Sequence, residues 1–402
     1  ASMTGLTVSD ADFNIYEETL AEYDEYSATF WQDAKAYSDV AVYVIGRMAG
    51  EGGDCPLDMA GYYGGEAGRH YLQLQPAEEE LLAKLEATFD KVIIVINASN
   101  PMDLGFIEDN KVDAAIWAGG PGTTGTIAVA KAMMGEYNPS GHLVDTYAYD
   151  VTSSPAYENF GDFTYANSGL TIDGNGDANN GKYMYYQEGI YVGYRYFETF
   201  ARDKVKYPFG FGLSYTRFQT ESMGLAVQGT EVTVIEKVTN VGGMSGRETI
   251  QVYVEAPQGK LGKPLRQLAA YAKTEELKPG AIEELILKAE LTELASYDDS
   301  GVTGHKSCYV LEEGDYIFYV GTDVRSAREV GRVTLAELQV VQTVTEALAP
   351  VQAFKRLRPF FFGENKHAIA NWEDVPLRTV DLVKRILQER PTRSEYMGDQ
   401  GW

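Results

Sequence analysis

A carboxylate on a glycine-flanked loop is the part of this sequence best suited to chemistry. Glu51 lies between Gly50 and Gly52, just after an apolar run of strand length, with Arg47 and Asp54 on either side. Glycines let a loop adopt unusual backbone angles and approach a ligand closely, and a carboxyl group can transfer protons to and from that ligand. The residues alone favour a solvated loop carboxylate at Glu51. Arg47 and Asp54 either hold the loop through an ion pair or bind the ligand.

Two other features of the sequence are weaker candidates for a site. Glu66 is a rival acid in the same loop region, but it stands further along the chain, and surface exposure is its default. The glycine-rich run 118–125 follows an apolar run and opens a helical pattern, as a phosphate-binding loop would. It lacks the Gly-Lys-Ser/Thr ending and the dinucleotide-binding spacing. The run therefore predicts a tight turn and close helix packing.

The sequence predicts neither a metal site nor a cofactor. Its four histidines are not spaced as metal ligands are; they are His70, His142, His305 and His367. No Ser/His/Asp constellation stands out.

Charge narrows the class of ligand. The 402 residues include 34 Lys and Arg against 59 Asp and Glu, a net charge of −25. Such a chain would be repelled by phosphate backbones and anionic membrane surfaces, so we expect no nucleic-acid or membrane partner. A neutral substrate such as a sugar fits better.

Length and the chain start give further expectations. The length suggests two or three domains. No apolar run approaches the length needed to span a bilayer, and the polar start 1–5 lacks the basic and apolar parts of a signal peptide. These features predict a cytoplasmic location. The two cysteines, Cys55 and Cys308, fall in different predicted domains and are expected to be reduced thiols.

The loop is preceded and followed by alternating strand and helix signals. Continuous apolar runs at 40–45, 92–96 and 114–118 predict strands buried on both faces, as in a parallel sheet. Helical patterns stand between or beside them, at 26–37, 76–89, 101–109 and 124–134. This alternation indicates an α/β domain over residues 1–146.

The pattern changes twice after that domain. Residues 147–210 are rich in Gly, Asn, Asp and Tyr and predict a long ordered connector with a flexible tip at 173–181. From 211 to 341 short runs of period two predict a β-sandwich, with strands at 232–240, 248–255, 284–288 and 315–321. The last stretch, 342–402, shows no core pattern and predicts a tail that lies along something larger.

Four blocks of residues, in order, resemble the family 3 glycoside hydrolases. The blocks are Gly50-Glu-Gly-Gly-Asp54, Asn138-Pro-Ser-Gly141, Glu188-Gly-Ile-Tyr-Val-Gly-Tyr-Arg-Tyr196 and Pro208-Phe-Gly-Phe-Gly-Leu-Ser-Tyr-Thr216. The resemblance covers residues 39 to 340 and implies a partial α/β sandwich with a mostly parallel sheet, followed by a fibronectin type III-like, immunoglobulin-like β-sandwich. In the third block we expect Glu188 and Arg195 to form a buried ion pair that anchors the connector.

The resemblance also implies a function. It places Glu51 as the general acid/base of a retaining β-glucosidase, with Arg47 and Asp54 as candidate substrate-binding residues. Retaining hydrolysis requires a second carboxylate about 5–5.5 Å away as nucleophile. The family nucleophile is an Asp in a Ser/Thr-Asp-Trp segment of a (β/α)8 barrel, and this sequence contains no such tripeptide. The partners implied are a β-glucoside or oligosaccharide substrate and a barrel that carries the nucleophile; a homo-oligomer is compatible with the sequence.

Two departures keep alternatives open. Residues 392–402, with Gly398-Asp-Gln-Gly401, resemble the linker of a permuted subgroup in which the barrel follows these domains. Few residues precede the Glu51 strand, so the α/β sheet is expected to be incomplete at its N-terminal side. The alternatives to a β-glucosidase half are a non-catalytic sugar-binding or scaffolding remnant of the fold, and a β-xylosidase of the same family.

Overall fold

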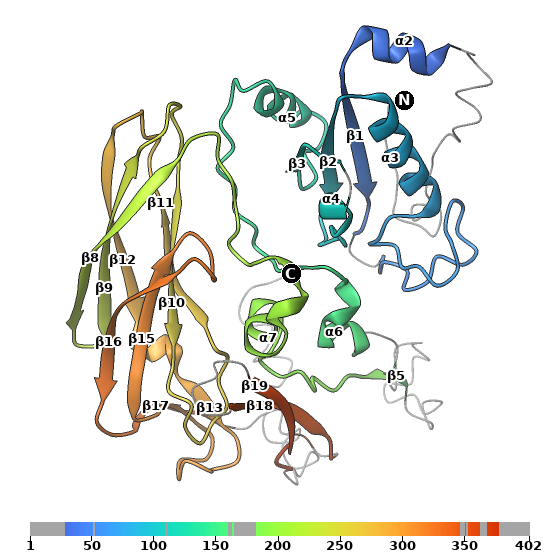
Figure 1. The fold of residues 1–402 in the computed structure, drawn as a ribbon. Coiled ribbons are helices and arrows are strands. Elements are labelled where there is room, and N and C mark those ends of the chain that lie inside the picture. The colour runs from blue at the N-terminus through green and yellow to red at the C-terminus, as the bar shows by residue number, and fades with distance from the viewer. Residues whose placement is uncertain are drawn as a thin grey trace, which may run out of the picture.

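The computed structural model describes residues 29–50, 53–109, 111–159, 163–164, 182–345, 350, 353–361 and 368–377. An α/β unit and a β-sandwich are joined by a connector that crosses between them (Figure 1). None of the described helices is long and apolar enough to cross a membrane.

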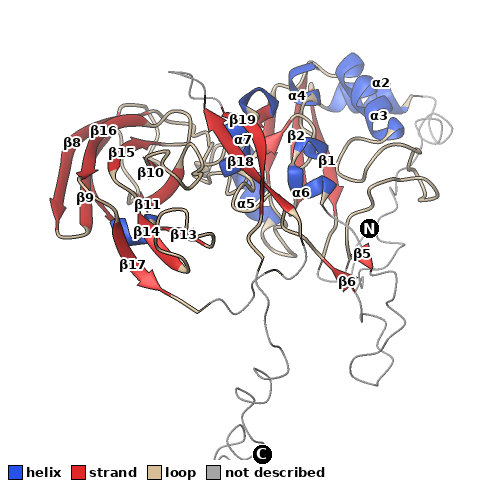
Figure 2. Ribbon diagram, turned by 90° about the horizontal axis from the view of Figure 1, so that it is seen from below, coloured by secondary structure: helices blue, strands red, loops and turns tan. Residues whose placement is uncertain are grey.

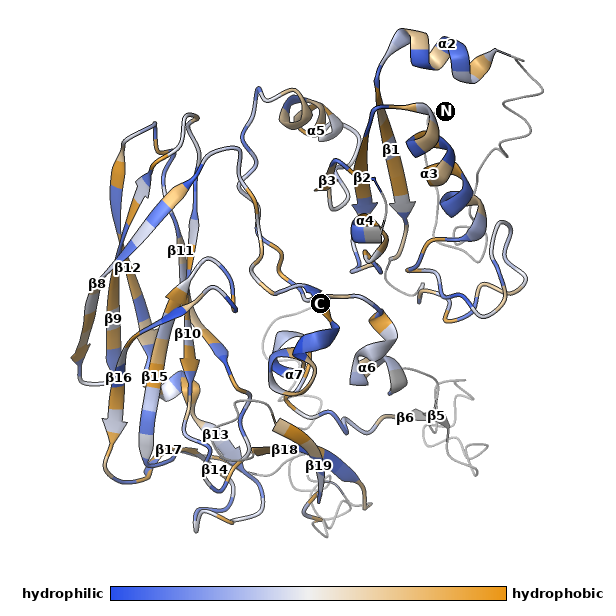
Figure 3. Cartoon of the chain, in the orientation of Figure 1, coloured by the Kyte–Doolittle hydropathy of each residue, from blue (hydrophilic) through white to orange (hydrophobic). Residues whose placement is uncertain are grey.

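The α/β unit is built on a three-stranded parallel sheet in the order β1-β2-β3. Its strands are β1 (Val40–Arg47), β2 (Lys91–Ala98) and β3 (Ala114–Trp117). Each coincides with an apolar run that predicted a strand, and Figure 3 shows the apolar residues along β1 and β2. Because the strands are parallel, their carboxyl ends meet at one edge of the sheet.

Helices of the unit fall within the predicted segments, although α4 is shorter than the predicted helix 101–109. They are α2 (Phe30–Tyr37), α3 (Pro76–Thr88), α4 (Phe106–Asp109) and α5 (Thr126–Met133). Helix α3 starts at Pro76, where the missing N–H costs nothing, and the Glu78 carboxylate accepts the N–H of Gln75 at 2.8 Å. Its Leu82 joins Ile94 and Ile96 in the main apolar cluster of the unit.

The prediction that β1 is buried on both faces is wrong in the described structure. Ala41 and Ile45 face the core, whereas Val42 and Val44 on the other face are 48% and 57% exposed. The apolar run predicted the strand correctly, but a face of a sheet is buried only where another element covers it. No described element covers this face of β1.

The connector is ordered by short elements. They are β4 (Tyr147–Ala148), η2 (Val151–Ser153), α6 (Pro155–Glu158), β5 (Phe163–Thr164), β6 (Lys182–Tyr183), α7 (Tyr194–Phe200), η3 (Arg202–Lys204) and β7 (Val205–Tyr207). Strands β4 and β7 pair with each other, so both ends of the connector lie together. The predicted flexible tip, 173–181, lies outside the described residues.

Two antiparallel sheets form the β-sandwich, in the orders β11-β10-β15-β16 and β12-β9-β8. Their strands are β8 (Phe218–Gln228), β9 (Glu231–Asn240), β10 (Thr249–Glu255), β11 (Gln267–Lys273), β12 (Ile282–Glu290), β15 (Gly314–Gly321) and β16 (Arg328–Leu335). Buried residues alternate along β9, as a strand with one face on a core requires. Val234, Ile250 and Phe318 belong to the core between the sheets.

A third small sheet and a hairpin complete the chain. The small sheet follows the short helix η4 (Leu291–Leu294) and has the strand order β13-β14-β17. Its strands are β13 (Ser296–Asp298), β14 (Cys308–Leu311) and β17 (Gln339–Thr343). The hairpin of β18 (Lys355–Phe361) and β19 (Ala368–Asp374) lies beside α7 (Figure 2). The Leu357 N–H donates to Gln187 O at 2.6 Å. Residues 342–402 show no core pattern in the sequence, so this hairpin was not predicted.

Candidate active site

A cavity of about 520 Å³ opens at the carboxyl ends of β1 and β2. Gly50 and Gly53 line it just after β1, and Asn100 lines it just after β2. Val151 and Tyr157 of the connector also line it. Ligands of open α/β sheets bind beyond the carboxyl ends of the strands, so the position suits a substrate.

The predicted acid/base loop forms part of this wall. The Gly53 N–H donates to Gly50 O at 2.9 Å, and the two residues form an isolated antiparallel bridge. Glu51 and Gly52 stand between them in the sequence and lie outside the described residues. The structure thus brings Gly50 and Gly53, which flank this undescribed part of the loop, to the cavity.

Arg47 holds the base of this loop. Its side chain is 1% exposed, and it forms a two-pronged ion pair with Glu78, the capping residue of α3, at 2.7 and 2.6 Å. Its three remaining N–H groups donate to the carbonyl oxygens of Gly46, Tyr71 and Gln73. All five guanidinium donors are therefore used. Of the two roles the sequence left open, this geometry favours loop support, and Arg47 does not line the cavity.

Tyr71 supports the loop from a second side. Its hydroxyl accepts the N–H of Met48 at 2.9 Å, between β1 and the glycines. The ring is 3% exposed and packs against Met59. Burial raises the pKa of Tyr71, so the phenol stays neutral. The backbone just before Glu51 is thus fixed by a buried arginine and a buried tyrosine.

Asp54 is placed differently from Arg47. It is exposed and lines the cavity, and it forms no ion pair with any residue that the structure describes. Next to it, burial and the Asp54 charge raise the pKa of the Cys55 thiol. Asp54 is thus available to accept hydrogen bonds from ligand hydroxyls, whereas the predicted ion pair with Arg47 does not form.

Three residues on the cavity wall were missed by the sequence prediction: His70, Asn100 and Tyr157. Asn100 comes shortly after the predicted strand 92–96. A polar residue just beyond the carboxyl end of a parallel strand could therefore have been predicted as part of the site. Tyr157 stood in a connector rich in tyrosine, where no single ring could be chosen. His70 had no signal, because only folding brings it to the wall.

His70 ties three segments together. Its Nε2 lies 3.2 Å from Asp103 Oδ2, and its side chain is 8% exposed. Asp103 Oδ1 accepts the N–H of Val151 at 2.8 Å, and the Tyr157 ring lies 6.3 Å from the imidazole. The pair therefore links the loop after β1, the segment after β2 and the connector.

The same region contains three groups of metal-ligand type. Donor atoms of His70, Asp103 and Asp150 lie within 4.8 Å of one another. The direct contact of His70 with Asp103 explains the geometry without an ion, so we assign none. The sequence could not predict the group, since its members are far apart in the chain.

Glu66 and the glycine-rich turn do not compete for the catalytic position. Glu66 is half-exposed and pairs with Arg69 at 2.6 Å, away from the cavity wall. Gly119, Gly120 and Gly122 have positive φ angles of 59°, 74° and 64°, which favour glycine. The run therefore makes the tight turn that the sequence predicted.

The predicted Glu188–Arg195 ion pair is wrong. Glu188 is buried, and it accepts a hydrogen bond from Asn159 Nδ2 at 2.9 Å. Arg195 points instead to a second cavity between the connector and the β-sandwich. Gly193, with φ 56°, stands between the two residues and starts a new helix, so their side chains diverge.

Comparisons with known families agree with this architecture. Residues 14–194 match the glycosyl hydrolase family 3 C-terminal domain, and residues 248–324 match a fibronectin type III-like domain. A β-glucosidase of Ruminococcus albus is 36% identical, with a match that covers 100% of this chain and 41% of that protein. Beta-glucosidase A of Butyrivibrio fibrisolvens is 32% identical over 88% of this chain and 46% of its own length.

Solved structures give the same picture. A β-glucosidase from Paenibacillus barengoltzii superposes with a TM-score of 0.80 at 38% identity, over 94% of this chain and 39% of that one. Beta-glucosidase 3B from Thermotoga neapolitana, solved with α-D-glucose, gives 0.64 at 31% identity, over 78% and 40%. The chain thus spans less than half the length of each of these relatives.

Proposed function

Because the chain belongs to glycosyl hydrolase family 3, of which it carries the C-terminal and fibronectin type III-like domains, we propose that it supplies the acid/base half of a retaining β-glucosidase. The observation that carries the proposal is the place of the Glu51 loop. Gly50 and Gly53 bridge to each other on the wall of a cavity at the carboxyl ends of β1 and β2. The relatives that support it are β-glucosidases by name.

In this proposal Glu51 has two tasks. It first protonates the glycosidic oxygen as the bond to the sugar breaks, and it then removes a proton from the water that releases the sugar. The nucleophile is an aspartate of a (β/α)8 barrel, which must approach to about 5–5.5 Å from Glu51. The barrel is the partner that we propose for this chain.

The described residues give the loop what such a step requires. A catalytic carboxyl group works only if it is held near its reacting atom, and small displacements are costly. Arg47 with Glu78 fixes the loop from one side, and the Tyr71 hydroxyl fixes it from another. We therefore assign Arg47 a positioning role.

The wall of the cavity would contact the departing group. Asp54 and Asn100 offer hydrogen-bonding side chains, and Tyr157 offers an aromatic face on which a sugar ring can pack. These residues are on the leaving-group side if the barrel holds the sugar that is cleaved. They are our candidates for contacts with the aglycone, and Asp54 is the substrate-binding residue already expected from the sequence.

A leaving-group series tests the proposal. The chain is combined with a family 3 barrel polypeptide, and hydrolysis of methyl and dinitrophenyl β-glucosides is measured for wild type and Glu51→Gln. Loss of a general acid slows cleavage by about 10²–10⁴ for a poor leaving group. Dinitrophenolate needs no proton to depart, so kcat/KM for its glucoside, which reports cleavage of the bond, should fall far less, whereas kcat should still fall because Glu51 is also the base of the second step. Equal, small losses on both substrates would contradict the acid role.

Two further arms sharpen the result. Glu66→Gln removes the rival carboxyl of the same region and should leave both rates unchanged. Aryl β-xyloside is assayed beside aryl β-glucoside with two barrels, one from a β-glucosidase and one from a β-xylosidase, because the barrel holds the sugar that is cleaved. Hydrolysis restored only with the β-xylosidase barrel would favour a β-xylosidase over a β-glucosidase. Absence of hydrolysis with a competent barrel would instead favour a non-catalytic remnant.

A further inference from the structure

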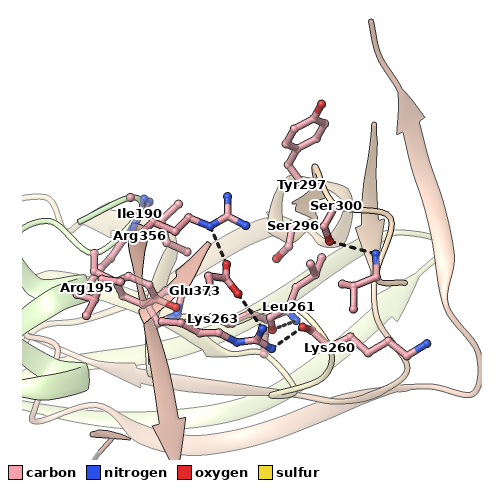
Figure 4. Close-up of a pocket in the computed structure, with 18 of the residues that line it drawn as sticks. Ile190, Arg195, Lys260, Leu261, Lys263, Ser296, Tyr297, Ser300, Arg356 and Glu373 are labelled. Atoms are coloured by element: carbon pink, nitrogen blue, oxygen red, sulfur yellow. Dashed lines mark hydrogen bonds and ion pairs between the residues drawn. The ribbon is translucent and has the colours of Figure 1, made fainter. Parts of the chain in front are cut away.

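A second cavity, of about 450 Å³, lies where the connector, the β-sandwich and the β18–β19 hairpin meet. Figure 4 shows its wall, with Arg195 from α7, Lys260 and Lys263 from the loop after β10, and Arg356 and Glu373 from the hairpin. Its size lies within the roughly 300–1,000 Å³ range of small-molecule sites. It is separate from the candidate active site, with which it shares no lining residue.

Positive charge gathers on this wall. Five cationic side chains line the cavity, against two carboxylates, in a chain of net charge −25. The cations are Arg195, Lys260, Lys263, Arg356 and Arg358, and the carboxylates are Glu373 and Asp374. An excess of cations in a strongly acidic protein favours an anion at this place.

Two of these cations, Lys263 and Arg356, are paired with carboxylates of the protein. Lys263 is buried and pairs with Glu312 behind the wall. Arg356 binds Asp299 through two bonds and Glu373 through a third, at 2.5, 3.0 and 2.6 Å. These charges are therefore balanced within the protein.

Arg358 belongs to the same network. It donates to Glu373 at 2.8 Å and to the carbonyl oxygen of Lys260 at 2.6 Å. The network holds the hairpin against the loop after β10, and it fixes the shape of the cavity.

Two of these cations have no counter-ion among the residues that the structure describes. Neither the Arg195 guanidinium nor the Lys260 ammonium forms an ion pair within the described part of the chain. Arg195 is half-buried at the start of α7, whereas Lys260 is exposed at the rim. A guanidinium on a cavity wall presents a planar set of donors suited to phosphate or carboxylate oxygens.

A buried hydroxyl supplies an independent sign of a ligand. Tyr191 is 3% exposed and lines the cavity, and its hydroxyl has no hydrogen-bond partner among the described groups. Buried polar groups are nearly always paired, so an orphan requires an explanation. Burial, with the Glu373 charge next, raises the pKa of Tyr191 above its usual range, so the phenol keeps its proton and can donate.

We propose that this cavity binds a small organic anion, a sugar-sized molecule that carries a phosphate or a carboxylate. Arg195 and Lys260 contact the anionic group, and the Tyr191 hydroxyl donates to it. Leu261 and Tyr297 on the same wall pack against the body of the molecule. A polyanion such as nucleic acid does not fit, because the rest of the surface carries the net negative charge.

Titration calorimetry on the 402-residue chain tests this proposal. The probes are inorganic phosphate, glucose 6-phosphate, glucuronate and glucose. The two charged sugars should bind more tightly than phosphate alone, and glucose should not bind. Binding of glucose 6-phosphate but not glucuronate identifies a phosphate site, and the reverse identifies a carboxylate site. Absence of binding by all the anions, or equal binding of glucose, overturns the proposal.

Variants locate the site. Arg195→Gln should weaken binding by about tenfold, the usual effect of losing one charge-assisted contact. Arg328→Gln removes the same charge from an exposed position on β16 and should leave affinity unchanged. Tyr191→Phe should also weaken binding, by less, because only one neutral donor is lost. Equal affinities for Arg195→Gln and Arg328→Gln, both with wild-type circular dichroism, would place the anion elsewhere.

Discussion

The two sheet systems of this molecule are covered in different ways. In the β-sandwich each sheet covers the other, and Ile250 and Phe318 are fully buried, at 0% exposure. In the α/β unit the described elements cover only one face of β1, and Val42 and Val44 on its other face are 48% and 57% exposed. The candidate active site lies at the edge of this second sheet.

The two parts thus differ in how their buried residues are held together. The β-sandwich gains its stability from a continuous apolar core. The α/β unit has a smaller apolar cluster and, beside it, the Arg47–Glu78 pair, which is the most buried ion pair of the site region. Substitutions in the two parts should therefore act by different mechanisms.

The largest effect is expected from Glu78→Ala. The change leaves the Arg47 guanidinium buried and unpaired, which costs about 3–5 kcal/mol, and it also removes the cap of α3. Hydrogen exchange should show lost protection in β1 and α3, with the β-sandwich unchanged. Glu80→Ala, an exposed carboxylate of the same helix, is the matched control. Similar exchange in both variants would mean that the ion pair does not anchor the unit.

A core truncation in the other part should be nearly as damaging. Phe318→Ala empties a fully buried site between the two sheets and should lower the free energy of unfolding by about 3–5 kcal/mol. Urea unfolding followed by region-specific hydrogen exchange would show the loss in β9, β10 and β15. Loss of protection in β1 and β2 to the same extent would mean that the two parts unfold as one unit.

A smaller, pH-dependent effect is expected at Glu236, which lies in the β-sandwich with an unpaired carboxylate oxygen. Burial raises the pKa of Glu236 in the folded state. The protonated carboxyl therefore contributes its full stabilisation below the pKa that Glu236 has in the unfolded chain. That stabilisation is lost as the pH rises through the higher pKa of the folded state. Glu236→Gln should raise Tm at pH 7 and change it little at pH 4. A larger gain at the lower pH would contradict the assignment.

The smallest effect is expected on the free face of β1. Val44→Thr changes a side chain that is more than half exposed, so the free energy of unfolding should move by less than about 0.5 kcal/mol. Thermal unfolding of the 402-residue chain measures it. A loss well above that value would show that this face is covered in solution, and the contrast between the two sheets would disappear.

The elements of the fold were largely predictable because their signals are local. Apolar runs gave β1 and β2, and Pro76 with its acidic first turn gave α3. Local patterns could not tell which face of β1 is covered, since that depends on distant elements. The β18–β19 hairpin was missed for a related reason, because β19 has few buried residues to mark a strand.

The candidate site was predictable only in part. The resemblance placed Glu51, and the structure brings its neighbours to a cavity. The role of Arg47 could not be chosen from spacing, because its partner Glu78 lies on a different element. The wall residues His70 and Tyr157 come together only through the connector, so no local pattern reports them.

Hydrolysis of an aryl β-glucoside tests the central claim most directly, for the purified chain and its Glu51→Ala variant, each alone and with a family 3 barrel polypeptide. We predict no hydrolysis by the chain alone above that of the variant, because our proposal places the nucleophile on the barrel. With the barrel, we predict hydrolysis that Glu51→Ala abolishes. Activity of the chain alone that Glu51→Ala removes would place the nucleophile within these residues, and barrel-dependent activity that survives Glu51→Ala would contradict the acid/base assignment.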